Sequence, residues 1–155
     1  MKEIRDKIAA LISSYQKQLD LYEQIRDVGA QERDLIAHGH LDQLLLVLQE
    51  KEALLKEAGA EETQIRSTQD FLTRHFELVS FSIPQLKQLA SHRYHQDIAS
   101  LEAVVARLVP VLELLEEQER DNEALLNEYL EQVKGYSADH LQAKRAQRAY
   151  KPSKQ

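Results

Sequence analysis

The sequence contains no cysteine and no tryptophan, and it has little glycine, proline or phenylalanine. Without cysteine, the chain has no disulfide and no thiolate ligand for a metal. Without tryptophan, and with three phenylalanines, it lacks the large aromatic side chains that fill a thick globular core. Four glycines and three prolines leave few places for turns, and no segment alternates apolar and polar residues as a half-buried strand does. These absences favour an all-helical protein of one domain with a thin core.

The sequence also lacks a long apolar run. A helix that spans a bilayer needs about 18 or more consecutive apolar residues, and no stretch approaches that length. The first residues, Met1-Lys2-Glu3-Ile4-Arg5-Asp6, carry charge where a signal peptide needs its apolar core. We therefore expect neither Sec export nor stable membrane insertion, and we expect a cytoplasmic location.

The most regular feature that is present is a 3-4 repeat of apolar residues between Leu41 and Val79. Only Lys51, Glu62 and Gln69 interrupt it. This spacing keeps one narrow apolar stripe on one side of a long helix, where the stripe faces another helix. The positions of the repeat are Leu41, Leu44, Leu48, Lys51, Leu55, Ala58, Glu62, Ile65, Gln69, Leu72, Phe76 and Val79.

Similar stripes predict three long helices, at about 2–38, 41–80 and 83–134. Gly39 suits the left-handed position just after a helix C-terminus, so the first two helices are expected to pack antiparallel after a short turn. Pro110 lies inside the third helix, where it removes a hydrogen bond and is expected to kink or break the helix. The predicted fold class is all-α, with long antiparallel helices in an up-and-down, coiled-coil-like bundle.

The charge is distributed unevenly along the chain. The net charge is -6, but residues 135–155 carry a local charge of +4, so the remainder carries about -10. The most acidic segment, 113–131, lies just before the basic one. Because residues 135–155 have little apolar spacing beyond Leu141 and Tyr150, we predict a flexible, disordered basic tail outside a helical bundle at 1–134.

Two other interpretations of the basic tail stay open. Basic segments bind the phosphates of nucleic acids and membranes, but the acidic body opposes such contact, and we expect no nucleic-acid partner. Alternatively, the tail folds back on the acidic segment at 113–131 and shields a binding face until a partner arrives.

The third predicted helix is longer than its two partners, so its part beyond Leu115 is expected to extend past them. Leu125, Leu126, Tyr129 and Val133 lie there on one side, with no obvious partner within the chain. An unmatched apolar stripe at the end of a helix is typical of a partner-binding surface. These residues are therefore candidates for contact with another protein.

Residue patterns of catalysis are missing. The sequence has no Gly-rich phosphate loop, no His-Glu-x-x-His motif and no Glu-x-x-His pair. Carboxylates are numerous, but none stands alone in an apolar stretch that would tune its pKa for acid–base chemistry. We therefore expect no enzyme, no cofactor and no metal. His92 and His95, with Asp97 nearby, form at most half of a metal site. A helical metal or ligand carrier is therefore a hypothesis that ranks below the two functions described next.

The junction of the first two predicted helices resembles the FlgN-type flagellar export chaperones. The residues that carry the resemblance are Ala37-His38-Gly39-His40-Leu41-Asp42-Gln43-Leu44, Leu48 and Lys51-Glu52-Ala53-Leu54-Leu55. The stretch from Glu119 to Tyr129, with Asn122, Leu125-Leu126 and Asn127, is similar to the Asn-rich segment that precedes the C-terminal tail in that family. Gly135-Tyr136-Ser137-Ala138-Asp139 is loosely similar to the tail itself.

This resemblance implies a cytoplasmic chaperone that binds the C-terminal, coiled-coil-forming regions of the hook–filament junction proteins. It would prevent their premature assembly and deliver them to the flagellar type III export apparatus. The resemblance places the binding element in the C-terminal helix and tail, which adds Asn122 and Tyr136 to the stripe derived from helix lengths, and Leu115 marks the start of that stripe. The expected client-binding residues are Leu115, Asn122, Leu125, Leu126, Tyr129, Val133 and Tyr136.

The alternative function is a self-associating coiled-coil scaffold or tether without a secreted client. Its apolar stripes would drive a tight oligomer, whereas a chaperone is expected to be a monomer or a weak homodimer until its client is added. Polar residues at seam positions, such as Lys51 and Glu119, favour specific and limited association over a permanent core.

Overall fold

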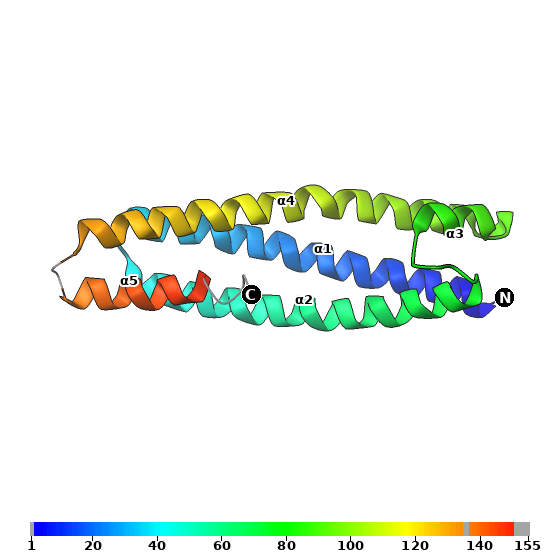
Figure 1. Cartoon of the computed structure of the whole chain (residues 1–155), viewed down its shortest axis with the longest axis horizontal. Coiled ribbons are helices and arrows are strands. Elements are labelled where there is room, and N and C mark those ends of the chain that lie inside the picture. Colours follow the sequence, from blue (N-terminus) through cyan, green and yellow to red (C-terminus); the bar gives the residue numbers. More distant parts are fainter. Residues whose placement is uncertain (1, 135–136, 151–155) are drawn as a thin grey trace. The chain divides into compact units, whose positions relative to one another are not determined.

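The computed structural model describes residues 2–134 and 137–150, and these residues are almost entirely helical (Figure 1). The long helices and the all-α class predicted from the sequence are confirmed. In chain order the elements are α1 (Lys2–Ala37), α2 (Leu41–His75), α3 (Ile83–Leu89), the 3₁₀-helix η1 (His92–Tyr94), α4 (His95–Gln132) and α5 (Ser137–Tyr150).

The chain divides into two compact units, and helices α1, α2 and α4 each contribute to both. The first unit contains the described residues up to Leu21 together with Glu57–Pro110. The second unit contains Tyr22–Lys56 and the described residues from Val111 onward. The second unit includes the expected client-binding region, so it is the one in which the candidate site is built.

Each unit has its own apolar core, which follows the predicted stripes. In the first unit, Ile65 and Leu72 of the predicted 3-4 repeat are buried with Ile8 and Leu11 of α1 and Leu101 of α4. Tyr15 and Gln69 meet at the edge of this core, where the Gln69 side-chain amide donates a hydrogen bond to the Tyr15 hydroxyl at 2.7 Å. The polar seam position at Gln69 is therefore satisfied by a partner from the facing helix.

Helices α1 and α2 end in the same hydrogen-bond pattern with different residues. At the end of α1, Gly39 has a positive φ of 71°, and the His40 amide donates to the Leu35 carbonyl at 2.9 Å. At the end of α2, Glu77 has a φ of 55°, and the Leu78 amide donates to the Thr73 carbonyl at 2.9 Å. Both ends are Schellman motifs, which place one left-handed residue after the last helical turn.

We expect substitutions at these two left-handed positions to change stability in opposite directions. A side chain disfavours the left-handed region by about 1–2 kcal/mol, so Gly39→Ala is expected to destabilise the protein by about that amount. Glu77→Gly is expected to stabilise it by up to about 1 kcal/mol, because the strain at residue 77 is relieved. Urea denaturation followed by circular dichroism measures the change in the free energy of unfolding for both variants. If both variants were destabilised, or both stabilised, this explanation would be contradicted.

The third predicted helix, at 83–134, is not continuous, and this prediction was wrong. Ser82 caps α3, because its hydroxyl accepts a hydrogen bond from the Gln85 amide at 3.4 Å. Helix α3 then ends because Ala90 is extended, with φ -74° and ψ 147°. The turn of η1 buries Tyr94 before α4 begins. The apolar register thus restarts at Tyr94.

Pro110 does not break α4, which runs from His95 to Gln132. Its side chain is exposed on the solvent side of the helix, so the missing backbone hydrogen bond removes no contact from the apolar stripe. Of the two predicted outcomes at Pro110, a broken helix is therefore excluded.

The prediction of a disordered basic tail was wrong for residues 137–150, which form α5. Ala143, Ala146 and Tyr150 follow helical spacing and are fully buried, whereas Leu141 is 59% exposed. Asp139 in the first turn and Arg148 in the last turn complement the helix dipole. The prediction failed because the alanines of this segment were not counted as apolar contact residues. Residues 135, 136 and 151–155 lie outside the described part of the chain.

Candidate functional site

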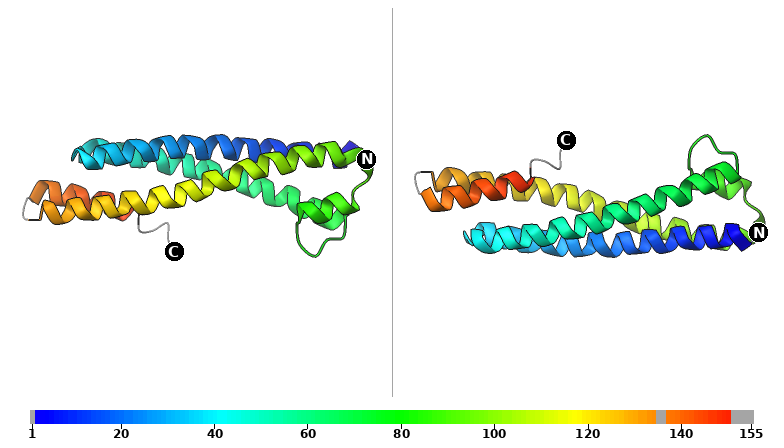
Figure 2. Two further views of the ribbon diagram at one scale, coloured as in Figure 1. Left: turned by 90° about the horizontal axis from the view of Figure 1, so that it is seen from above. Right: turned by 90° about the horizontal axis from the view of Figure 1, so that it is seen from below.

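The predicted stripe on α4 does have a partner within the chain, contrary to the expectation from helix lengths. Leu126 is fully buried, and it belongs to a cluster that also contains Leu130, Ala143, Ala146 and Tyr150. Helix α5 runs back along the C-terminal half of α4 in both views of Figure 2. The third interpretation of the tail, in which it folds back on the acidic segment, is therefore the one that matches the structure.

The surface beneath α5 is made of large aliphatic side chains from three helices. We call this surface the α5 seat. It consists of the buried residues Ile36 of α1, Leu41, Leu44 and Leu48 of α2, and Leu126 and Leu130 of α4, with Leu35, Leu45, Leu125 and Tyr129 partly buried at its edge. Against these, α5 supplies two alanines and one tyrosine. The seat is therefore far more apolar than the helix that covers it.

Asn122 lies at the α1–α4 contact rather than on the surface. Its side chain is 2% exposed, and its amide donates a hydrogen bond to the Gly29 carbonyl at 3.0 Å. One turn earlier, the Gln118 amide donates to the Arg26 carbonyl at 2.9 Å. A Cβ atom at residue 29 would lie 2.0 Å from Oε1 of Gln118, so Gly29 permits this close approach of the two helices.

The other expected client-binding residues lie at the edges of the buried cluster. Leu115, Leu125, Tyr129 and Val133 are each partly buried. The ring of Tyr129 lies against the turn between α1 and α2, because its hydroxyl is 3.2 Å from the position of a Cβ at Gly39. Tyr136 lies outside the described residues. The structure thus brings Leu125, Leu126 and Tyr129 together around the α5 seat.

A network of charged and polar groups closes one end of the α5 seat. Nζ of Lys51 lies 3.3 Å from Oε1 of Glu32 and 2.8 Å from Oε2 of Glu119. The Tyr150 hydroxyl donates a hydrogen bond to Oε1 of Glu32 at 2.6 Å, and Nζ of Lys51 lies 4.9 Å from the centroid of the Tyr150 ring. Helices α1, α2, α4 and α5 therefore meet through four side chains, which we call the Lys51 network.

Glu32 is fully buried in the Lys51 network, and no part of its side chain is exposed. Burial raises the pKa of Glu32 above its ordinary value of 4.5, while the Lys51 charge and the Tyr150 hydrogen bond oppose the rise. Burial and the neighbouring Glu32 carboxylate likewise raise the pKa of Tyr150 far above its ordinary value of 10.0. The hydroxyl of Tyr150 therefore stays protonated and remains a hydrogen-bond donor.

Sequence reasoning missed most of the Lys51 network, although a signal for it was present. Lys51 and Glu119 were both recognised as polar interruptions of apolar seams on separate helices. Opposite charges at seam positions of two helices that pack together indicate a buried ion pair. Glu32 and Tyr150 had no such signal, because Glu32 was assigned to no apolar seam and Tyr150 was assigned to a tail.

A groove of about 610 Å³ continues from the α5 seat within the second unit. Ala149 at the end of α5 lines it together with Glu32, Lys51 and Asn122, so the groove begins where the described part of α5 ends. We call it the apolar groove. Its apolar lining consists of Tyr22, Ile25, Leu55, Leu112 and Leu115, and its charged lining also includes Glu116, Glu119 and Arg120.

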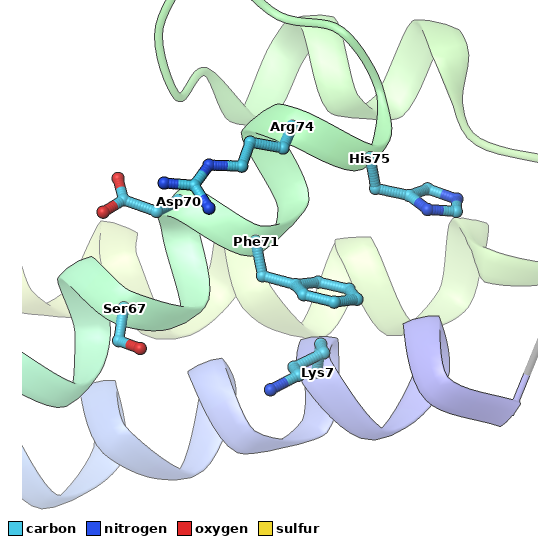
Figure 3. A pocket seen from close by; sticks show the side chains of 6 residues that line it. All are labelled: Lys7, Ser67, Asp70, Phe71, Arg74 and His75. Carbon is cyan, nitrogen blue, oxygen red and sulfur yellow. The ribbon is translucent and has the colours of Figure 1, made fainter.

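A second hollow, in the first unit, has a different character (Figure 3). It lies between Lys7 of α1 and α2, and Nζ of Lys7 is 4.9 Å from the centroid of the Phe71 ring. Ser67, Asp70, Arg74 and His75 complete its lining, and none of these four is buried. This arrangement is an open polar surface without a catalytic pattern.

The histidines form no metal centre in the part of the chain that the structure describes. His92 and His95 face each other edge to face with their ring centroids 4.9 Å apart. Over the described residues, no three His, Asp or Glu side chains are grouped so as to hold a metal ion. Within the same residues, no helix is both long and apolar enough to cross a membrane.

Comparison with known protein families gives a match over the whole chain. The model of the family described as FlgN protein matches residues 1–155. No curated protein and no solved structure matches the chain significantly.

Proposed function

Because the chain belongs to the FlgN protein family, we propose that it binds the C-terminal helical segments of hook–filament junction proteins. In this proposal it prevents their premature assembly in the cytoplasm and delivers them to the flagellar type III export apparatus. Family membership implies the broader role of a flagellar export chaperone that binds hook-associated proteins. FlgN chaperones are a non-enzymatic family.

The observation that carries the proposal is the α5 seat, an aliphatic surface built from α1, α2 and α4. An amphipathic helix that lays its apolar face in a hydrophobic groove is a common mode of peptide recognition. The proposed client segments form coiled coils in their assembled state, so they carry such a face. A chaperone that occupies this face keeps the client from burying it in the filament.

We assign different roles to the expected client-binding residues. Leu115, Leu125, Tyr129 and Val133 retain exposed surface, and we propose that they contact the client directly. Asn122 is buried at the α1–α4 contact, and we propose that it holds the shape of the binding surface from below. Leu126 is part of the α5 seat, and we propose that it contacts a client that occupies the seat. Tyr136 stays in the proposal as a contact from the segment that joins α4 to α5.

The proposal is tested by calorimetry with the full-length protein and the purified C-terminal segments of the hook–filament junction proteins from the same bacterium. We expect saturable binding of one segment per chain. Because apolar surface is buried, the heat capacity change of binding is expected to be negative. The absence of binding by a fully helical protein would refute the proposal.

The same material distinguishes the self-associating scaffold. Light scattering after size-exclusion chromatography gives the mass of the free protein. A tight oligomer that does not bind added junction segments would favour the scaffold, whereas a monomer or weak dimer that forms a complex with one client segment supports the chaperone.

Exposed leucines such as Leu46 and Leu114 are single residues and do not by themselves require a partner.

A further inference from the structure

Helix α5 covers the α5 seat with little apolar material of its own. Its buried face consists of Ala143, Ala146 and Tyr150, while its leucine, Leu141, points outward. Two of these three residues are alanines, which bury little apolar area, so apart from Tyr150 the contact gains less free energy than a helix with aliphatic side chains would gain on the same seat. Besides the contacts of Tyr150 with Glu32 and Lys51, α5 makes side-chain hydrogen bonds at exposed positions, Gln147 to Asn127 at 2.6 Å and Gln142 to Asp42.

The apolar groove extends the surface that α5 occupies. Ala149 marks its start, and Leu112 and Leu115 lie further back along α4. From Asn122 to Leu112 the groove follows about ten residues of helix, or about 15 Å. A helix longer than α5 would therefore fill the seat and the groove as one continuous site.

The polar chemistry at the junction of seat and groove adds a requirement for the occupant. Oε1 of Glu32 accepts the Tyr150 hydroxyl and lies near Lys51, whereas Oε2 of the same carboxylate is buried with no hydrogen-bond partner among the described residues. Any helix that replaces α5 takes away the Tyr150 donor. A suitable replacement brings a hydrogen-bond donor to the same place, because a buried carboxylate that loses one of its two donors is destabilised, and Lys51 alone would remain.

From these observations we propose that α5 is an internal substitute for the client, and that the client helix displaces it from the α5 seat and extends into the apolar groove. The inference rests on the proposed function and names the regulation and specificity of that site. The preferred client is an amphipathic helix with a longer apolar stripe than α5 and one hydroxyl, amide or amine donor at the position of Tyr150. In the absence of such a helix, α5 keeps the aliphatic seat out of water.

A reversible lock on α5 tests this inference in the full-length protein. The natural chain has no cysteine, so Asn127→Cys with Gln147→Cys introduces two thiols at exposed positions whose native side chains are hydrogen bonded. A short bismaleimide with a reducible spacer then joins α4 to α5. We expect the locked protein to bind the junction segment at least about tenfold more weakly, because its open state is depleted. Reduction of the spacer is expected to restore the affinity.

Two substitutions test the separate parts of the inference. Tyr150→Phe removes only the donor to Glu32 and destabilises the closed state, so we expect client affinity to rise by about fivefold to tenfold. Leu55→Glu places a charge in the groove at a residue that is already 44% exposed, and it is expected to weaken binding by about tenfold or more. The matched control is Leu46→Glu, which is 65% exposed on the same helix and outside the groove, with an expected change of less than about twofold.

The outcomes separate the inference from the proposed function. Equal affinities for the locked and the reduced protein would show that α5 does not cover the client site, and the inference would fail while the chaperone function stood. Equal effects of Leu55→Glu and Leu46→Glu would remove the groove from the site. If the unlocked protein binds no junction segment at all, the proposed function and the inference are both refuted.

Discussion

Lys51→Met is expected to destabilise the second unit by about 3–5 kcal/mol at neutral pH. The substitution keeps the length and most of the volume of the side chain but removes the ammonium group, which lies 3.3 Å from Oε1 of Glu32 and 2.8 Å from Oε2 of Glu119. Glu32 is fully buried, so its carboxylate is left with the Tyr150 hydroxyl and a neighbouring negative charge. Urea denaturation followed by circular dichroism measures the loss.

The control for Lys51→Met is the double variant with Glu32→Gln. Replacing a buried ion pair by neutral residues of similar volume is often close to neutral, whereas removing one partner is costly. We therefore expect Glu32→Gln to restore most of the stability lost in Lys51→Met. If the double variant is as unstable as the single one, the loss comes from packing of the lysine chain and not from the uncompensated carboxylate.

The pH dependence provides a second readout of the same carboxylate. Since the pKa of Glu32 is raised above 4.5 in the folded protein, the folded state holds this proton more tightly than the unfolded state. The contribution of Glu32 to the free energy of unfolding therefore falls as the pH rises from about 4.5 through the raised pKa. Lys51→Met raises this pKa further, so its destabilisation is expected to shrink near pH 5 and to be largest near pH 8. In the Glu32→Gln background this difference should vanish.

Leu126→Asp is expected to unfold the second unit. Leu126 is fully buried among Ile36, Leu44 and Tyr150. Truncation of a buried leucine to alanine costs about 2–5 kcal/mol, and an unpaired carboxylate at the same place adds several more. The total is comparable with the whole stability of a small domain, which is about 5–15 kcal/mol. Circular dichroism and limited proteolysis report the loss of folded structure.

The matched control for Leu126→Asp is Leu114→Asp on the same helix. Leu114 is 43% exposed, so the new charge stays in water and we expect a loss of no more than about 1 kcal/mol. If Leu126→Asp keeps its folded structure as Leu114→Asp does, Leu126 lies on the surface and not in the core. A loss of client binding in Leu126→Asp is therefore not a test of the binding surface, and partly exposed residues such as Leu125 serve that purpose.

The sequence was sufficient to predict the long helices and the identity of much of their buried face. The predicted 3-4 repeat contains Leu41, Leu44 and Leu48 in the second unit and Ile65 and Leu72 in the first, and all five are buried. The turn at Gly39 was predicted from the need for a left-handed residue, and the positive φ confirms it. These features depend on local backbone preference and helical periodicity, which a single sequence contains.

The features that were missed depend on contacts between distant segments. The role of α5 rests on small residues, and Ala143 and Ala146 become core only because Leu126 and Leu130 lie opposite them. Glu32 is 118 residues from Tyr150 along the chain, yet the two share a hydrogen bond. The break at Ala90 has the buried residues Leu86 and Tyr94 on either side of it, and the predicted helix at 83–134 gave no sign of it. Tertiary packing decided each of these points.

The Lys51 network also bears on the alignment of α2 against its neighbours. A 3-4 repeat is nearly unchanged when a helix slides by seven residues, so apolar contacts alone leave several alignments close in energy. Such a slide would bring Leu44 or Ala58 to the place of Lys51, opposite Glu32 and Glu119. The fully buried Glu32 carboxylate and the partly buried Glu119 carboxylate would then lack their ammonium partner. Lys51 interrupts the apolar stripe of α2, and it thus selects one alignment of this helix. The leucines of the stripe alone would not distinguish that alignment from one shifted by seven residues.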